Sequence, residues 1–207
     1  MAEADFFSKA TPAAVEEAVR AVEAATAAEL VVAGRRQAAR WPAVDLAVGM
    51  MAGFVTLLLL LFHPYEFPVT GMPVGVLVVG GLFWWLSSSL WGWKRLLLRR
   101  RRVDDVVAMA AKAAFVDLGV SRTTGRTGVL VAFFVLERRV ELVVDVNVDP
   151  APLASVHVQL QTAFDAFDFA AFVTALKALG PILGAQLPRS ADDVNELPDA
   201  MVVDHAR

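Results

Sequence analysis

Six side chains with carboxylate or amide oxygens are the residues of this chain most suited to chemistry. They form two groups, at the end of a predicted strand and in the C-terminal segment: Asp145, Asn147, Asp149, and Asn195, Glu196, Asp199. Such oxygens are the ligands that Ca²⁺ and Mg²⁺ take in proteins. A C-terminal segment folded back onto the sheet would unite them in a divalent-cation site. The alternative is a solvated strand end and a surface tail, because Asn and Asp are also turn formers.

Other kinds of chemistry find little support in the sequence. The chain has no cysteine, which excludes a thiol nucleophile, a disulfide scaffold and a cysteine-ligated metal. The three histidines, His63, His157 and His205, fall in a predicted loop, a helix and a tail, and do not form a ligand set. No Gly-rich phosphate loop with Lys-Ser/Thr is present. The polar segment 119–128, with Arg122 and Arg126, could bind an anion or be a solvated connection.

Hydrophobic periodicity predicts the elements that carry these residues. Helices are expected at 11–26, 103–118, 153–167 and 169–187, the last interrupted at Gly180-Pro181. Apolar and β-branched runs predict strands at 29–33, 128–136 and 139–145, the last two joined by a tight turn at Glu137-Arg138. The tail 189–207 is expected to be irregular. The fold class is therefore α/β, with a small central sheet flanked by helices.

A pair of long apolar segments interrupts this pattern. The chain has 207 residues, of which 57% are hydrophobic, and the excess lies in residues 44–93. Segments 44–62 and 73–93 approach the length of about 20 residues that a transmembrane helix needs. Arginines lie on both outer flanks, whereas the connecting loop carries only Glu66 as a full charge. By the positive-inside rule, both flanks are expected in the cytosol. The alternative is a buried helical hairpin in a soluble protein.

The expected organisation is one discontinuous cytosolic domain, 1–40 with 103–207, into which a transmembrane hairpin is inserted at 44–93. The basic segment 94–102 connects the two, and Arg99–Arg102 would contact anionic lipid headgroups. A net charge of −3 gives no reason to expect nucleic acid as a partner. The acidic N-terminus lacks the features of a secretory signal. The chain is thus predicted to be an integral protein of a bacterial inner membrane, with both termini cytosolic.

Several motifs resemble the TPM-domain family, which includes the thylakoid lumen phosphatase-like proteins, a photosystem II repair protein and a nematode receptor regulator. The resemblance is carried by Arg126-Thr-Gly-Val-Leu and Leu136-Glu-Arg-Arg-Val-Glu in the strand pair, by Asn195-Glu-Leu-Pro-Asp199 and by Phe6-Phe7-Ser8. A bacterial branch of membrane proteins is the most similar. The resemblance implies an α/β sandwich that binds a divalent cation through acidic side chains at one edge of the sheet. Some members are phosphatases, and others assemble or regulate membrane complexes.

The chain departs from that branch where the second strand of the pair ends. The branch has Asp-x-Gly-Ile there, whereas this chain has Asp145-Val-Asn-Val148. The missing glycine, together with the absence of a compact catalytic set, favours a non-catalytic role. The predicted function is a membrane-anchored binding, assembly or regulatory module that responds to Ca²⁺ or Mg²⁺ and works with a membrane protein complex. The alternative is a metal-dependent phosphatase of the TPM type.

Overall fold

One folded unit is inserted into the sequence of the other. The computed structural model describes residues 11–64, 68–90, 100–189, 196–198 and 200–204. It divides the chain into Met1–Ala38 with Asp104–Arg207, and Ala39–Val103. The boundaries expected from the sequence, after residue 40 and before residue 103, lie within a few residues of this division. Each unit is described below by itself.

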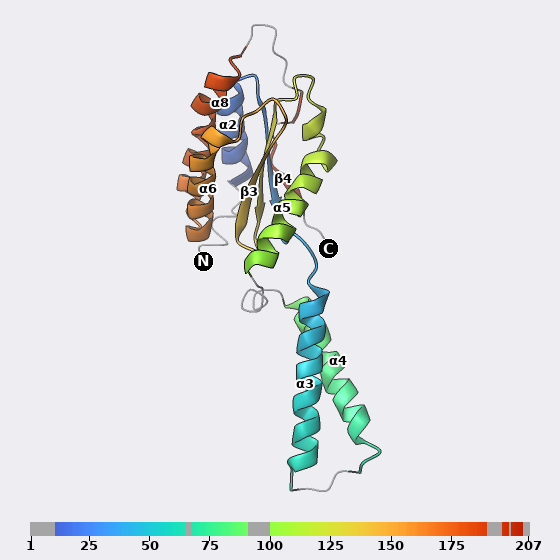
Figure 1. Cartoon of the computed structure of the whole chain (residues 1–207). Coiled ribbons are helices and arrows are strands. Elements are labelled where there is room, and N and C mark those ends of the chain that lie inside the picture. Colours follow the sequence, from blue (N-terminus) through green and yellow to red (C-terminus); the bar gives the residue numbers. More distant parts are fainter. Residues whose placement is uncertain (1–10, 65–67, 91–99, 190–195, 199, 205–207) are drawn as a thin grey trace. The chain divides into compact units, whose positions relative to one another are not determined.

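A four-stranded sheet forms the centre of the discontinuous unit in the described part of the chain. Its strands are β1 (Glu29–Arg35), β2 (Gly128–Phe134), β3 (Arg139–Val144) and β4 (Val202–Asp204). Their order is β3-β2-β1-β4; β1 is parallel to both β2 and β4, and β2 is antiparallel to β3 (Figure 1). The prediction of an irregular tail is wrong at residues 202–204, because β4 pairs with the end of β1 at Ala33–Arg35.

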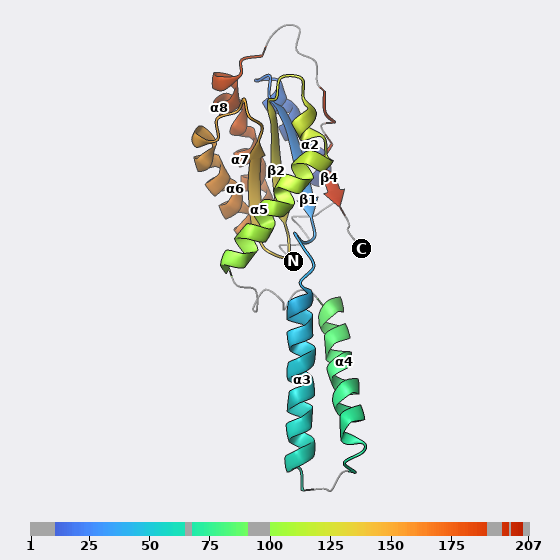
Figure 2. The same cartoon turned by 45° about the vertical axis from the view of Figure 1, so that its right-hand side comes forward.

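Helices cover both faces of the sheet (Figure 1 and Figure 2). One face carries α2 (Thr11–Glu23), α6 (Ala154–Ala166), α7 (Phe169–Lys177) and α8 (Leu179–Gln186), and the other carries α5 (Arg100–Asp117). The core of the first face centres on Phe133 of β2. Its ring centroid lies 5.4 Å from that of Phe164 in α6 and 5.8 Å from that of Phe172 in α7. These tilted and edge-on contacts are favourable for aromatic pairs.

Burial explains why β2 is an unbroken apolar run. All seven of its residues are buried, as expected of a central strand covered on both faces. At its start, Gly128 passes so close to Val120 that an added Cβ would lie 2.3 Å from the Val120 carbonyl oxygen. The preceding helix α5 ends at a left-handed Gly119 with φ 74°. Glycine can end the helix in this way because it adopts the left-handed conformation without a Cβ clash.

Two predicted boundaries differ from the structure. The last helical region breaks at Ala178 rather than at Gly180-Pro181, giving separate helices α7 and α8. Pro181 lacks the N–H that would bond to the Lys177 carbonyl, so the helix ends one turn before the proline. The β2–β3 connection is also longer than a two-residue turn, spanning residues 135–138. Arg138 takes the left-handed position there, with φ 51°.

The inserted unit contains two helices packed against each other, α3 (Pro42–Phe62) and α4 (Met72–Ser89). Glycines permit the close approach: a Cβ on Gly49 would lie 2.8 Å from both the Gly80 carbonyl oxygen and the Trp84 Cβ. Asp45 lies one turn before Gly49 in α3. Its buried carboxylate accepts a hydrogen bond from the buried Ser87 hydroxyl. The second segment was predicted to extend to residue 93, but residues 91–93 lie outside the described part.

Three helical stretches of the described chain are long and apolar enough to cross a membrane, judged by length and composition alone. They are Pro42–Phe62, Met72–Ser89 and Phe169–Gln186, with mean hydropathies of 2.3, 1.4 and 1.3. The third comprises α7 and α8, whose Phe172, Leu176 and Leu183 are fully buried in the core. Its apolar side chains are therefore used for packing within the discontinuous unit. In Pro42–Phe62 and Met72–Ser89, by contrast, most side chains are not buried.

Candidate functional site

The predicted ligands that the structure describes lie at or next to one end of the sheet. At this end β1 and β2 begin and β3 finishes, as the register pairing of Gly128 with Glu29 and of Val129 with Val144 requires. The loop at residues 121–127 enters here from α5, and the C-terminal segment passes here before β4. The opposite end of the sheet is where β1 leaves toward the inserted unit.

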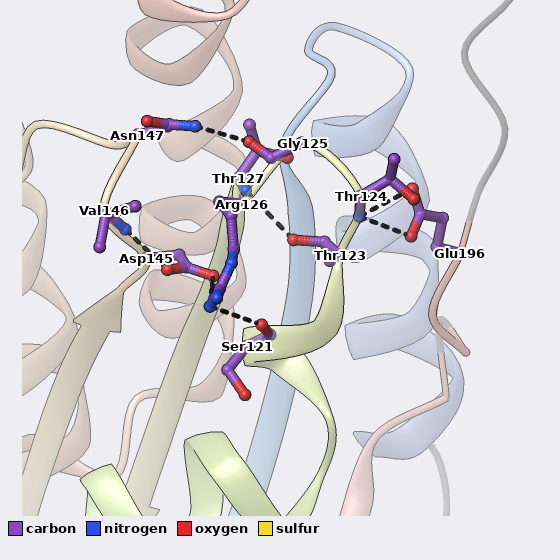
Figure 3. Close-up of polar contacts among 10 residues, drawn as sticks. All are labelled: Ser121, Thr123, Thr124, Gly125, Arg126, Thr127, Asp145, Val146, Asn147 and Glu196. Carbon is purple, nitrogen blue, oxygen red and sulfur yellow. Dashed lines mark hydrogen bonds and ion pairs between the residues drawn. The ribbon is translucent and has the colours of Figure 1, made fainter.

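Asp145 is the buried carboxylate of this region. Its side chain is only 4% exposed, and its Oδ1 atom accepts a hydrogen bond from the Val146 N–H at 2.8 Å. The Oδ2 atom has no hydrogen-bond partner in the part of the chain that the structure describes. It lies 3.9 Å from Nη1 of Arg126, whose side chain is 58% exposed (Figure 3). A buried carboxylate requires such a neighbouring charge, because leaving water is otherwise costly.

Arg126 is held in place by the loop that contains it. It has a left-handed backbone, with φ 51°. Its N–H donates to the Thr123 carbonyl at 3.0 Å, and its Nη1 donates to the Ser121 carbonyl at 3.0 Å. The Thr127 N–H donates to the Thr123 hydroxyl at 3.1 Å. The loop that was considered as an anion site thus directs one arginine toward Asp145 (Figure 3).

Asn147 and Asp149 each bond to a neighbouring backbone group. The Asn147 amide donates to the Gly125 carbonyl at 2.8 Å, in the loop above Asp145 in this view (Figure 3). Asp149 accepts the Ala151 N–H at 3.0 Å, at the start of the next helical turn. Within the described ranges, no group of three or more His, Cys, Asp or Glu side chains could hold a metal ion.

The C-terminal segment does fold back onto this end of the sheet. Glu196 accepts the Thr124 N–H through both carboxylate oxygens, at 2.9 and 3.3 Å. In return, the backbone N–H groups of Glu196 and Leu197 each donate to an oxygen of Glu29, at 3.2 Å. The other two predicted ligands of this group, Asn195 and Asp199, lie outside the described residues.

Glu29 is a residue of this site that the sequence reading missed as a functional group. It is only 6% exposed, although it carries a carboxylate. The available signal was its position: an acidic residue that opens a strand of otherwise apolar residues needs donors at that strand end. Thr124 was considered only for binding an external anion. Its N–H instead donates a hydrogen bond to a carboxylate of the chain itself, that of Glu196.

The one resolved pKa shift in the described region lies away from this cluster. Burial raises the pKa of Glu141, in the middle of β3 on the face toward α5. The carboxylates of the candidate site are used differently: Glu29, Glu196 and Asp145 each accept backbone N–H groups. Charge-assisted bonds of this kind fasten loops and termini. The arrangement leaves one carboxylate oxygen, on Asp145, for a further ligand.

No protein-family model and no curated protein matches this sequence. A solved structure is similar to it: the NMR structure of the BA42 protein from the psychrophilic bacterium Bizionia argentinensis. The TM-score is 0.56 at 16% sequence identity, over 96% of this chain and 96% of that chain. At this identity the likeness concerns the fold alone. It agrees with an α/β architecture in which helices flank a small mixed sheet.

Proposed function

We propose that this protein is a membrane-anchored α/β domain of the TPM type, which acts as a binding, assembly or regulatory module at the cytosolic face of a bacterial inner membrane. The observation that carries the proposal is the apolar surface of the inserted helices. Side chains such as Met50, Phe54, Leu59 and Leu77 are 57–74% exposed. Contiguous apolar surface of this extent on a protein marks a membrane or partner interface.

Helix length supports a membrane rather than a protein partner for this surface. At 1.5 Å per residue, the 21 residues of α3 span about 31 Å, close to the 30 Å of a hydrocarbon core. Neither helix contains a charged residue beyond Asp45, whose carboxylate is buried against Ser87. Arg35, Arg36 and Arg40 precede α3, and this basic flank favours the cytosolic orientation.

The TPM assignment is supported by where the resembling motifs lie. Arg126, from the strand-pair motif, forms an ion pair with Asp145, which follows β3. Glu196, from the C-terminal motif, binds the Thr124 N–H in the same loop. These contacts give the motif residues a shared structural role at one end of the sheet. Because they engage the backbone of the domain itself, they favour a binding module over a catalyst.

A cation response is a second candidate, favoured by the unbonded Oδ2 atom of Asp145. Ca²⁺ or Mg²⁺ would bind there as Arg126 moves aside, and the loop at residues 121–127 would change with it. The metal-dependent phosphatase remains the catalytic alternative. Turnover of a phosphate ester by the purified protein with Ca²⁺ or Mg²⁺, lost in Asp145→Ala, would establish that alternative and overturn the non-catalytic proposal.

Single cysteines test the anchoring, since the chain has none of its own. Val69 lies between α3 and α4 and is 77% exposed, and Val158 on α6 is 65% exposed. In spheroplasts, a membrane-impermeant maleimide should label Val69→Cys at once and Val158→Cys only after lysis. The reverse pattern would contradict the orientation. Equal labelling of both, with the protein extracted by carbonate, would contradict the membrane anchor.

A further inference from the structure

Along the outer edge of β3, every second residue directs its backbone N–H and C=O groups away from the sheet. β3 is the first strand in the order β3-β2-β1-β4, so it has a partner on one side only. The Asp145 N–H donates to the Gly128 carbonyl, which places the odd-numbered residues of this strand in the ladder with β2. In an antiparallel pair the alternate residues direct their N–H and C=O groups outward. These are Val140, Leu142 and Val144.

Side chains of α6 cover the first of these positions. The Val140 N–H donates to the Gln161 side-chain oxygen at 2.9 Å. The Val140 carbonyl lies 2.7 Å from Nε2 of His157. The Gln161 amide also donates to the Arg138 carbonyl at 3.1 Å. Covering an edge in this way prevents it from pairing with another strand.

The described residues leave the next two positions uncovered. No hydrogen bond joins the outward N–H and C=O groups of Leu142 or Val144 to any residue that the structure describes. The strand at 140–144 contains no Pro and no Lys, two devices that protect exposed edges. Leu142, Val143 and Val144 are all half-buried. Beyond them the Val146 N–H is occupied again, by Asp145 Oδ1. The open edge is therefore two outward positions long.

We propose that a second copy of this chain occupies this edge, with the two β3 strands antiparallel about a two-fold axis at Val143. In this register Leu142 of each copy faces Val144 of the other. Each such pair exchanges two N–H to C=O bonds, so the dimer satisfies both open positions in each copy. The covered Val140 and the occupied Val146 N–H terminate the ladder on either side.

The spacing of the open groups is what favours a second copy. Two outward positions separated by one inward residue are self-complementary under a two-fold axis, and isologous contact is the commonest form of homodimer. Glu141 would lie opposite Asp145 of the other copy. The charge of that Asp145 is already offset by Arg126 at 3.9 Å, which limits the like-charge repulsion.

A cysteine at the axis tests the proposal in the full-length protein. In Val143→Cys the two sulfurs would belong to a directly opposed pair with Cβ atoms about 4.5 Å apart, within reach of a disulfide. Mild oxidation should give about tenfold more covalent dimer than in Met109→Cys, a 73% exposed control on α5. Glu141→Cys should cross-link poorly, because it does not face itself. Equal yields from Val143→Cys and Met109→Cys would overturn the proposal.

Backbone variants test the hydrogen bonds themselves. In the Val143→Cys background, Val144→Pro removes an outward N–H while leaving the ladder to β2 intact, as edge prolines do. It should abolish the cross-link, whereas Val144→Ala, which keeps the N–H, should retain it. Retention of the cross-link in a folded Val144→Pro protein would overturn this register. A disulfide-linked species with a mass other than that of a dimer would show that another protein occupies the edge.

Discussion

The Oδ2 atom of Asp145 lies 3.9 Å from the Nη1 atom of Arg126, and this contact closes the β2–β3 strand pair at the end where β2 begins and β3 finishes. The carboxylate is buried and the guanidinium is more than half exposed. Removing one partner therefore has a different cost from removing the other. The buried Asp145 carboxylate needs the charge of Arg126 more than the exposed guanidinium needs the charge of Asp145. Losing the arginine leaves a buried charge, whereas losing the carboxylate leaves a solvated one.

Arg126→Ala should lower the free energy of unfolding by about 1 kcal/mol, because the buried carboxylate loses its neutralising neighbour. Thermal unfolding of the full chain in detergent measures this. Arg122→Ala, in an exposed residue of the same loop, is the matched control and should have little effect. Added Ca²⁺ should stabilise Arg126→Ala more than the wild type, and not the double variant with Asp145→Asn. Equal stabilisation of all three proteins would exclude Asp145 as the cation ligand.

Glu196→Ala should release the C-terminal segment from the loop. The variant loses two carboxylate contacts to the Thr124 N–H and should lose about 1–2 kcal/mol of stability. Hydrogen exchange of the Thr124 amide should become faster. Glu17→Ala, which removes an exposed carboxylate 3.0 Å from Lys177, is the control and should change stability by less than about 1 kcal/mol. Unchanged hydrogen exchange at the Thr124 amide would argue against a stable contact between Glu196 and the loop.

Gly49→Leu should separate the helices of the inserted unit, because a Cβ there would lie 2.8 Å from the Gly80 carbonyl. Gly81→Leu places the same side chain on α4 where nothing lies within 4 Å, and it should be tolerated. A pair of cysteines in α3 and α4 reports the helix contact through disulfide yield. If both leucine variants give the wild-type yield, the helices do not pack through Gly49.

Glu141→Gln should change how stability depends on pH. Burial raises the pKa of Glu141, and the neighbouring Asp104 carboxylate acts in the same direction. Nearby positive groups oppose them: His157, Arg139 and Lys112. The native state therefore binds this proton more tightly than the unfolded chain, so stability falls as pH rises from the ordinary carboxyl pKa through the raised one.

Glutamine is uncharged at all pH values, so the variant does not show the fall in stability that Glu141 causes as pH rises. The difference in Tm between Glu141→Gln and wild type should therefore shift in favour of the variant between pH 4 and pH 7. Scans at both pH values in the same detergent measure the shift. A constant difference between the two proteins would mean that Glu141 titrates alike in the folded and unfolded states.

The central strands could be predicted because their own sequences determine them. Runs such as Gly128–Phe134 are apolar throughout and leave no alternative to a covered strand. β4 could not be predicted in this way, since Val202–Asp204 is three residues long and has no periodicity of its own. These residues become a strand because they pair with β1, and that pairing depends on the tertiary structure rather than on the local sequence.

The residues of the candidate site could likewise be predicted only in part. Asp145 was predicted as an oxygen ligand at the end of a strand, but its partner, Arg126, comes from the loop before β2. Asn147 and Asp149 have suitable spacing, yet each bonds to a nearby backbone group instead. Sequence spacing shows which side chains share a strand end. It does not show which backbone donors and acceptors compete for them.

The pairing of β1 has a consequence for the biosynthesis of the chain. Both strands that flank it, β2 and β4, follow the inserted helices in the sequence. While the ribosome translates α3 and α4, β1 has left the exit tunnel or is about to, with no neighbour to bond. The discontinuous unit therefore completes its sheet only after the inserted helices have been made, so a nascent-chain chaperone would meet β1 without its neighbouring strands during that interval.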